Sequence, residues 1–213
     1  MGAFLTSWLE NSVRGSVRNS TYNRHESLCR VHLIPALSRR KLKTLSAADV
    51  AGFYRSRLDS GCSAASVHKM HKTLHKALRQ AVRWGYMVKN PADDVDPPRV
   101  HTQEVTPLAR EEARRLLNTV QGDRLEALYV VALHTGLRQG ELPPLHWEDL
   151  DLKACTLQVH RTVTKDGGKL SIGPAKTAQS RRTVKLTRDA TYALKAPGPP
   201  TRRDRRVRRL LRG

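Results

Sequence analysis

Two cationic side chains, Arg138 and Lys176, stand in short sequence patterns that predict a fixed position for each. Arg138 lies two residues after Gly136, within residues 135–142, at the start of a predicted short helix over residues 137–142. Lys176 follows a Pro-Ala pair and precedes residues 180–184, so it falls in the predicted turn of a β-hairpin. A guanidinium and an ammonium on rigid elements suit a site that grips a phosphate group. We expect the two groups to lie together.

The charge of the chain indicates what would carry that phosphate. The 213 residues have a formal net charge of +20, and residues 1–95 contain 16 Lys and Arg against 6 Asp and Glu. Such an excess predicts a polyanionic partner, most simply nucleic acid, whereas a ribosomal-type or merely soluble basic protein is the alternative. The first 95 residues would form the main electrostatic surface.

Three further residues accompany the two cations. Glu141 lies three residues after Arg138, a spacing at which side chains meet on one helical turn. It would either orient the Arg138 guanidinium or form an ordinary surface ion pair of little value. We expect Arg181 and Arg182 to contact a DNA backbone or to lie on a solvated strand edge.

Residues 1–95 predict a domain of four helices. Ser46, with Asp49 three residues later, predicts the start of the third helix, and Gly61 ends it. The fourth helix has apolar residues at three- and four-residue steps from Val67 to Val82, which form the buried face. Its cations lie largely off that face and are the predicted DNA-binding residues: Lys69, Lys72, Lys76, Arg79 and Arg83.

The remaining residues predict a linker, a second domain and a tail. Residues 96–107 contain paired prolines and form a stiff linker. Residues 108–195 predict helices over 110–120 and 123–134, three short strands over 156–163, 169–172 and 182–186, and a final helix over 188–195. The buried stripe of the second of these helices would be Leu125, Leu128, Tyr129, Ala132 and Leu133. Residues 196–213 form an Arg-rich tail, which we interpret as non-native sequence after a frame change or other truncation.

Four short segments, in this order and at this spacing, resemble the tyrosine recombinases, the phage-integrase family. They are residues 81–85 with 90–91, residues 135–142, residues 147–151, and residues 176–177 with 180–184. The resemblance extends over residues 1–195. It implies a mainly α fold with a small antiparallel β-sheet (α+β). The N-terminal SAM-like four-helix core-binding domain would be followed by a partial integrase catalytic domain.

The resemblance also implies roles for the two cations. Arg138 matches the first catalytic arginine of the family, and it would hold a non-bridging oxygen of the phosphate at which the strand is cut. Lys176 matches the hairpin lysine, a general acid toward the leaving 5′ oxygen, or it would only contact phosphate. The partners would be double-stranded DNA at an attachment-type site and other recombinase protomers. No cofactor and no small-molecule substrate are expected.

The resemblance stops before the second half of the family's active site. The family has a His-x-x-Arg motif and a nucleophilic tyrosine, yet no histidine follows Lys176. Tyr192 is the one tyrosine after that lysine, and we interpret it as a helix-packing residue. We therefore expect DNA binding without recombination. The alternatives are a non-catalytic DNA-binding regulator that competes with an intact integrase, and a basic RNA-binding protein.

The sequence argues against a metal site, a disulfide framework and a membrane span. His68, His71 and His75 have the helical spacing of metal ligands, but no Cys, Asp or Glu completes a set, so we expect a DNA-facing or solvated surface and no metal. Three widely spaced cysteines give no disulfide framework. No apolar run reaches the ~18 residues of a membrane span. A cytoplasmic, nucleoid-associated protein is the expectation.

Overall fold

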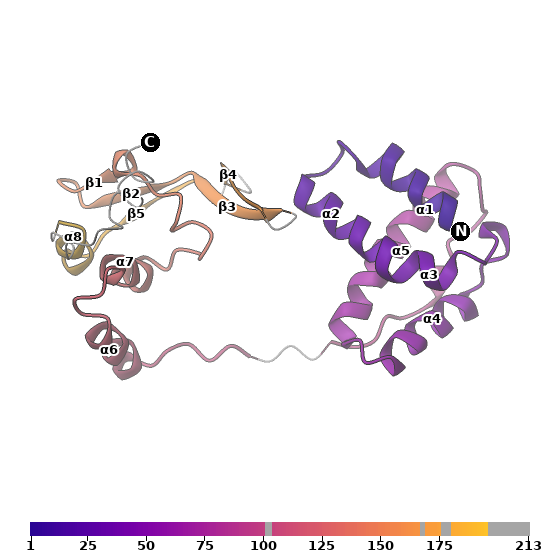
Figure 1. Cartoon of the computed structure of the whole chain (residues 1–213), viewed down its shortest axis with the longest axis horizontal. Coiled ribbons are helices and arrows are strands. Elements are labelled where there is room, and N and C mark those ends of the chain that lie inside the picture. Colours follow the sequence, from indigo (N-terminus) through magenta and orange to yellow (C-terminus); the bar gives the residue numbers. More distant parts are fainter. Residues whose placement is uncertain (101–103, 167–168, 176–179, 196–213) are drawn as a thin grey trace. The chain divides into compact units, whose positions relative to one another are not determined.

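The computed structural model describes residues 1–100, 104–166, 169–175 and 180–195, and its elements are labelled in Figure 1. The chain divides into two compact units, Met1–Glu104 and Val105–Gly213. The division lies inside the predicted linker, residues 96–107. Helices and small antiparallel sheets together make an α+β fold, as the sequence predicted.

The first unit contains four helical segments, because some neighbouring elements run into one another without a break. The opening segment and the second segment each include one π-helical stretch, at which the helical backbone continues. The segments are α1 (Gly2–Trp8) with η1 (Leu9–Val13); α2 (Asn19–Leu28) with η2 (Cys29–Leu33) and α3 (Ile34–Leu37); α4 (Ala47–Asp59); and α5 (Ala64–Arg83). Short 3₁₀ turns follow at η3 (Leu42–Thr44) and η4 (Pro91–Asp94). The four predicted helices are thus present.

The start and end of α4 follow from local chemistry. The Ser46 hydroxyl accepts a hydrogen bond from the Asp49 backbone N–H at 3.2 Å, and the Asp49 carboxylate accepts one from the Ser46 N–H at 3.1 Å. This reciprocal pair is the predicted capping box. At the other end Gly61 has a φ of +85°, a conformation that a residue with a Cβ rarely adopts. Both predicted boundaries are confirmed.

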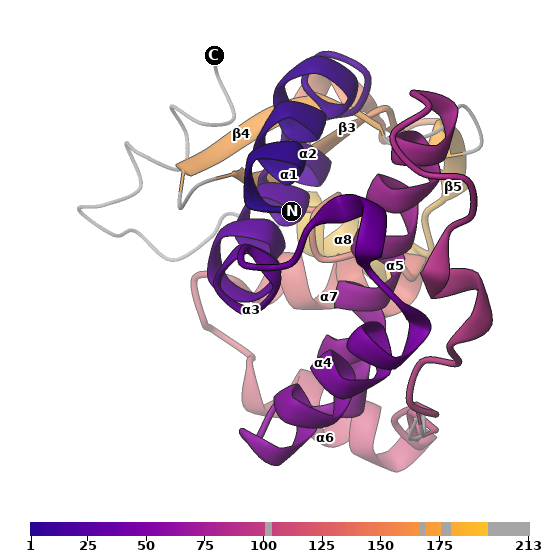
Figure 2. The same cartoon turned by 90° about the vertical axis from the view of Figure 1, so that its right-hand side faces the viewer.

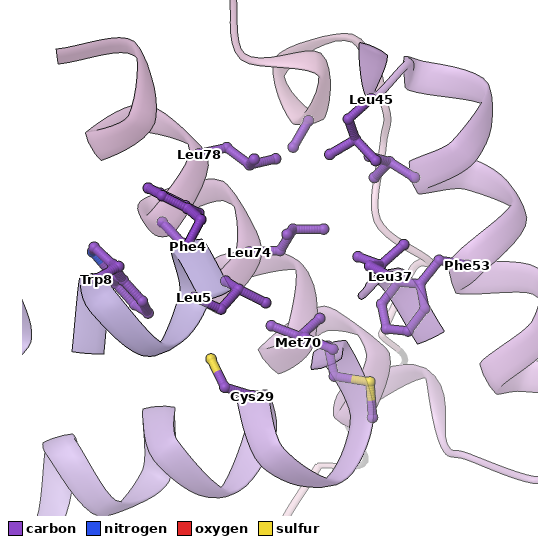
Figure 3. Packing of buried hydrophobic residues seen from close by; sticks show 14 of the residues in the cluster. Phe4, Leu5, Trp8, Cys29, Leu37, Leu45, Phe53, Met70, Leu74 and Leu78 are labelled. Carbon is purple, nitrogen blue, oxygen red and sulfur yellow. The ribbon is translucent and has the colours of Figure 1, made fainter. Parts of the chain in front are cut away.

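The core of the first unit forms around α5, which runs between α4 and the two N-terminal segments (Figures 1 and 2). Met70, Leu74 and Leu78 of α5 are fully buried. Figure 3 shows them among side chains from α1 and α4, including Leu5 and Phe53. The predicted apolar face of α5 is therefore confirmed as the face that packs.

The second unit places helices beside short strands. Its elements in the described residues are α6 (Arg110–Thr119), α7 (Glu126–Thr135), η5 (Trp147–Asp149), β1 (Leu150–Asp151), β2 (Thr156–Val159), β3 (Arg161–Asp166), β4 (Lys169–Pro174), β5 (Arg182–Lys185) and α8 (Arg188–Lys195). Strands β1, β2 and β5 form one antiparallel sheet in that order, with Leu157 opposite both Leu150 and Val184. Strands β3 and β4 pair separately as an antiparallel hairpin.

The strand prediction was wrong at residues 156–163, and it missed the two-residue strand β1. Residues 156–163 do not form a single strand, because the chain leaves the β2–β5 sheet at His160 and continues in the β3–β4 hairpin. The His160 carbonyl accepts a hydrogen bond from Ala175 N–H at 2.9 Å, at the base of that hairpin. Residues 156–163 contain no glycine or proline, so their sequence gives no signal for such a change of partner.

Two predictions of burial in the second unit were also wrong. Tyr192 on α8, interpreted as a packing residue, is 78% exposed. On α7, Leu128, Tyr129 and Leu133 are each more than a third exposed, and Val131 is instead the buried residue. The small core that does form contains Val131, Leu137, Leu157, Val159, Leu186 and Ala190.

Candidate functional site

Arg138 is held in a turn that begins where α7 ends. Gly136 ends the helix with a φ of +61°, and Leu137 next to it is buried in the core. The Glu141 N–H then donates to the Arg138 carbonyl at 2.8 Å, which closes a turn and not a helix. The predicted short helix over residues 137–142 is therefore wrong. The prolines at 143 and 144 have no N–H with which to continue a helical ladder.

Gly140 fixes the turn against strand β3. Its carbonyl accepts hydrogen bonds from the Val163 N–H at 2.7 Å and from the Thr162 hydroxyl at 3.1 Å. A Cβ at Gly140 would lie 3.0 Å from the Thr162 hydroxyl oxygen and 3.0 Å from the Val163 carbonyl oxygen. A side chain there would push the turn away from β3. Glycine therefore allows the turn that contains Arg138 to lie against this strand.

Glu141 is the buried centre of the site. It is 4% exposed, and its carboxylate accepts hydrogen bonds from the Arg138 backbone N–H at 3.0 Å and from Arg138 Nη1 at 3.1 Å. It also accepts two from Arg182, from Nη1 at 3.2 Å and from Nη2 at 2.9 Å. The pair is thus not the ordinary surface ion pair that the sequence left open.

The donors around Glu141 set its charge. The hydrogen bonds from Arg182, and then those from the backbone and side chain of Arg138, outweigh burial and lower the pKa of Glu141 to about 2. The same pairing raises the pKa of Arg182. Glu141 is therefore ionised at neutral pH.

Arg138 is held in place by hydrogen bonds, while most of its guanidinium remains exposed to solvent. Its backbone N–H and one terminal nitrogen are bound to Glu141, yet its side chain is 73% exposed. A guanidinium carries five N–H donors, so most of them face solvent. One edge of the guanidinium is held by Glu141 and the other is exposed to solvent. Such a cation can bind an anion without first having to be ordered.

Arg182 occupies a position that sequence reasoning did not foresee. It was predicted to contact DNA, but the structure pairs it with Glu141 from strand β5, 41 positions along the chain. Its side chain is 32% exposed, so it does not lie on a fully solvated strand edge. Its contact with DNA stays a prediction.

A second buried carboxylate, Asp149, organises the neighbouring cations. It accepts hydrogen bonds from the His146 backbone N–H at 2.8 Å and from Arg161 Nη2 at 2.7 Å, and His160 Nε2 lies 3.4 Å away. His160, Arg161 and Arg181 line a pocket of about 500 Å³. Sequence reasoning missed Arg161 and His160, because nothing in the spacing of either residue links it to Asp149.

Lys176 and the three residues after it lie outside the described residues. Immediately before them, Ala175 is buried, and its N–H donates a hydrogen bond to the His160 carbonyl. It resumes at Ser180, two residues before Arg182. The predicted approach of Lys176 to Arg138 therefore stays a prediction.

The predicted DNA-binding residues of α5 form a single face. At 3.6 residues per turn, Lys69, Lys72, Lys76, Arg79 and Arg83 fall within roughly 80° of arc, and the buried stripe lies roughly opposite. Four of the five are exposed, and Lys76 is half-buried. Among the described residues none of the five has an ion-pair partner, whereas exposed Arg14 and Arg30 are each paired with a glutamate.

Two of the three histidines beside this face have separate hydrogen-bond partners, whereas the buried His68 Nδ1 has none among the described residues. His71 Nδ1 lies 2.7 Å from the Tyr54 hydroxyl, and His75 Nε2 lies 2.6 Å from Asp93 Oδ1. Within the described part of the chain no group of three His, Cys, Asp or Glu is arranged to hold a metal ion. In the same part, no helix is both long enough and apolar enough to cross a bilayer.

Comparison with known proteins supports the integrase resemblance. Residues 1–57 match the family model described as phage integrase, N-terminal SAM-like domain. An integrase of Saccharopolyspora erythraea is 29% identical over 168 residues, which are 78% of this chain and 38% of that protein. These matches support a tyrosine recombinase.

Solved structures of integrases have the same fold. The Tn1549 transposon integrase, in complex with a circular intermediate DNA, matches with a TM-score of 0.78 and 21% identity over 94% of this chain and 66% of that chain. A lambda integrase tetramer bound to a Holliday junction matches with a TM-score of 0.67 and 17% identity, over 99% and 62% of the two chains. The chain spans less than half the length of the curated relatives that it matches.

Proposed function

We propose that these 213 residues are the DNA-gripping part of a site-specific recombinase, and that Arg138 binds the phosphate at which strands are exchanged. The observation that carries this proposal is the Glu141 clamp, by which we mean Glu141 together with Arg138 and Arg182. In the clamp, the buried, charged carboxylate of Glu141 holds Arg138, whose guanidinium remains exposed to solvent. A structural arginine would be enclosed by its partners, whereas Arg138 is held and left open.

The face of α5 supplies the second contact with DNA. Its unpaired cations lie opposite the core, so they meet a duplex backbone without losing any intramolecular bond. Binding of this kind releases counterions, and its affinity falls as salt rises, with a slope of about −0.9 for each phosphate contacted. Affinity would therefore be strong at low salt and largely independent of sequence.

The chemistry at the phosphate follows from the family relation. In a recombinase with a complete site, the arginine matched by Arg138 would stabilise charge on the non-bridging oxygens, and the lysine matched by Lys176 would deliver a proton to the leaving 5′ oxygen. These residues do not contain the family's His-x-x-Arg motif, and Tyr192 projects from α8 into solvent. We propose that they bind DNA without cutting it, in the cytoplasm at the nucleoid, alongside other recombinase protomers.

DNA affinity of matched arginine variants tests this function. Fluorescence anisotropy with a duplex of about 30 base pairs would show Arg138→Ala weakening binding about tenfold and reducing the salt slope by about 1. Arg114→Ala is the control, because Arg114 is an exposed arginine of the same unit, paired with Glu111 at 3.2 Å, and it should change neither quantity. Equal DNA affinities of the parent protein, Arg138→Ala and Arg114→Ala would contradict the proposal.

A nicked duplex tests the claim of inactivity separately. Attack by a tyrosine would leave a covalent protein–DNA product that survives denaturing electrophoresis. We expect no such product. A product that disappears in Tyr192→Phe would show that Tyr192 is a nucleophile, and it would overturn this part of the proposal.

A further inference from the structure

Two half-buried histidines border the basic face of α5, one on each side of it. The basic face consists of Lys69, Lys72, Lys76, Arg79 and Arg83. On one side is His71 of α5 itself, whose Nδ1 lies 2.7 Å from the Tyr54 hydroxyl of α4. On the other side is His25 of α2, whose Nδ1 lies 3.0 Å from the Thr73 hydroxyl of α5. On a helical wheel the five cations lie between Thr73 and His71.

His25 is kept uncharged by burial and by the cations near it. The indole of Trp8 packs edge-on against its ring, with the two ring centroids 5.6 Å apart. Burial lowers the pKa of His25, and the positive charges of Lys76 and Arg24 lower it further. Because Lys76 belongs to the basic face, the face itself opposes protonation of this ring.

His71 is kept uncharged in the same way on the other side. Burial lowers its pKa, and His75, His68 and Lys72 lower it further, while the Asp93 carboxylate of η4 acts in the opposite direction. The centroids of the His68 and His75 rings are 6.3 and 5.7 Å from that of His71. Helix α5 contains no aspartate or glutamate, so no carboxylate of this helix offsets the charge of its lysines.

We propose that His25 and His71 take up protons when DNA binds to the basic face, so that binding strengthens as the pH falls. Phosphates on this face would neutralise its lysines, which oppose protonation of both rings, and would add negative charge nearby. Charges interact over a Debye length of about 8 Å at physiological ionic strength, and an opposite charge favours the protonated imidazole. The same phosphate contacts would therefore hold the duplex and favour proton uptake.

The inference rests on the proposed DNA-binding function and adds regulation of the same surface by pH. Binding and protonation are reciprocal, so a ligand that favours the protonated rings is itself bound more tightly when they are protonated. Each proton taken up can raise the affinity by up to about tenfold for each unit that the pH falls.

Calorimetry of the 213-residue protein with a duplex of about 30 base pairs counts the protons. Titrations at about pH 6.5, in buffers with different enthalpies of ionisation, should show uptake of about one to two protons. The affinity should be higher at about pH 6 than at about pH 8. The double variant of His25→Gln and His71→Gln should lose most of the uptake, and its affinity should change little with pH.

His32→Gln is the matched control. His32 is a half-buried histidine of the same unit, and within the described residues it makes no hydrogen bond or ring contact. Its replacement should leave the proton uptake unchanged. Ring resonances of the parent protein in nuclear magnetic resonance provide the same test without a substitution. The titration midpoints of His25 and His71 should move to higher pH when DNA is added, whereas that of His32 should not.

Two results would overturn this inference while leaving the proposed function intact. One is DNA binding without proton uptake or any movement of the two midpoints. The other is proton uptake that the double variant retains in full. Absence of DNA binding at both pH values would refute the proposed function, and this inference with it.

Discussion

Replacing Glu141 with glutamine removes the charge of the clamp while keeping its shape. The pKa of Glu141 falls from 4.5 to about 2, a difference equivalent to roughly 3 kcal/mol of interaction between the carboxylate and its donors. Glu141→Gln should therefore destabilise the second unit by about 3 kcal/mol at pH 7. It leaves two guanidiniums facing each other without an anion, and a broken buried pair costs this much in other proteins.

The matched control is Glu111→Gln. Glu111 and Arg114 are also three residues apart, and they lie 3.2 Å from each other against 3.1 Å for Glu141 and Arg138, but both side chains are more than 60% exposed. This change should cost no more than about 0.5 kcal/mol. Amide hydrogen exchange, read from peptides of β2 and β5, measures the stability of the second unit without interference from the first.

The pH dependence has a definite sign. A carboxyl group with a lowered pKa in the folded protein stabilises it above its unfolded pKa of 4.5 and stops doing so as the pH falls toward about 2. The parent protein should lose this stability between pH 4.5 and 2, and Glu141→Gln should show no such loss. If Glu141→Gln and Glu111→Gln cost the same small amount, the clamp does not hold Arg138 and our reasoning is wrong.

Single substitutions at other positions test the DNA-binding face of α5 and the stability of the first unit. Lys72→Ala should reduce the salt slope of DNA binding by about 1 in anisotropy titrations, while Arg30→Ala, whose guanidinium is already paired with a glutamate, should not. Ser46→Ala should destabilise the first unit by about 1 kcal/mol in urea unfolding, since it removes a helix cap. Leu74→Ala should cost roughly 2–5 kcal/mol in the same assay, because Leu74 is fully buried. Burial lowers the pKa of His71 below 6.5, so the first unit should lose stability as the pH falls below that value, and His71→Gln should reduce the loss.

Local signals predicted the first unit well. The capping box at Ser46, the stop at Gly61 and the long amphipathic run of α5 each depend on residues only a few positions apart. Such features are decided by hydrogen bonds and periodicity within one segment. The same locality explains why the basic face of α5 could be placed from sequence.

Contacts between segments that are distant in the chain could not be predicted from the sequence. Arg182 reaches Glu141 across 41 positions, and Arg161 reaches Asp149 across 12 positions, from strand β3. Neither pairing has a local signal, because it depends on how β5 and β3 lie against the turn. The apolar stripe of α7 misled in another way. Its pattern predicts burial, yet Leu128, Tyr129 and Leu133 are each more than a third exposed.

The central claim is that Arg138 and Lys176 hold one phosphate together, and a double-mutant cycle on DNA affinity tests it directly. The proteins are the parent, Arg138→Ala, Lys176→Ala and the double variant, each titrated with one duplex at one salt concentration. We predict that the two losses are not additive, with a coupling of about 1 kcal/mol or more, as for groups that share a partner. Losses that add within about 0.3 kcal/mol, or no loss at all, would contradict the claim.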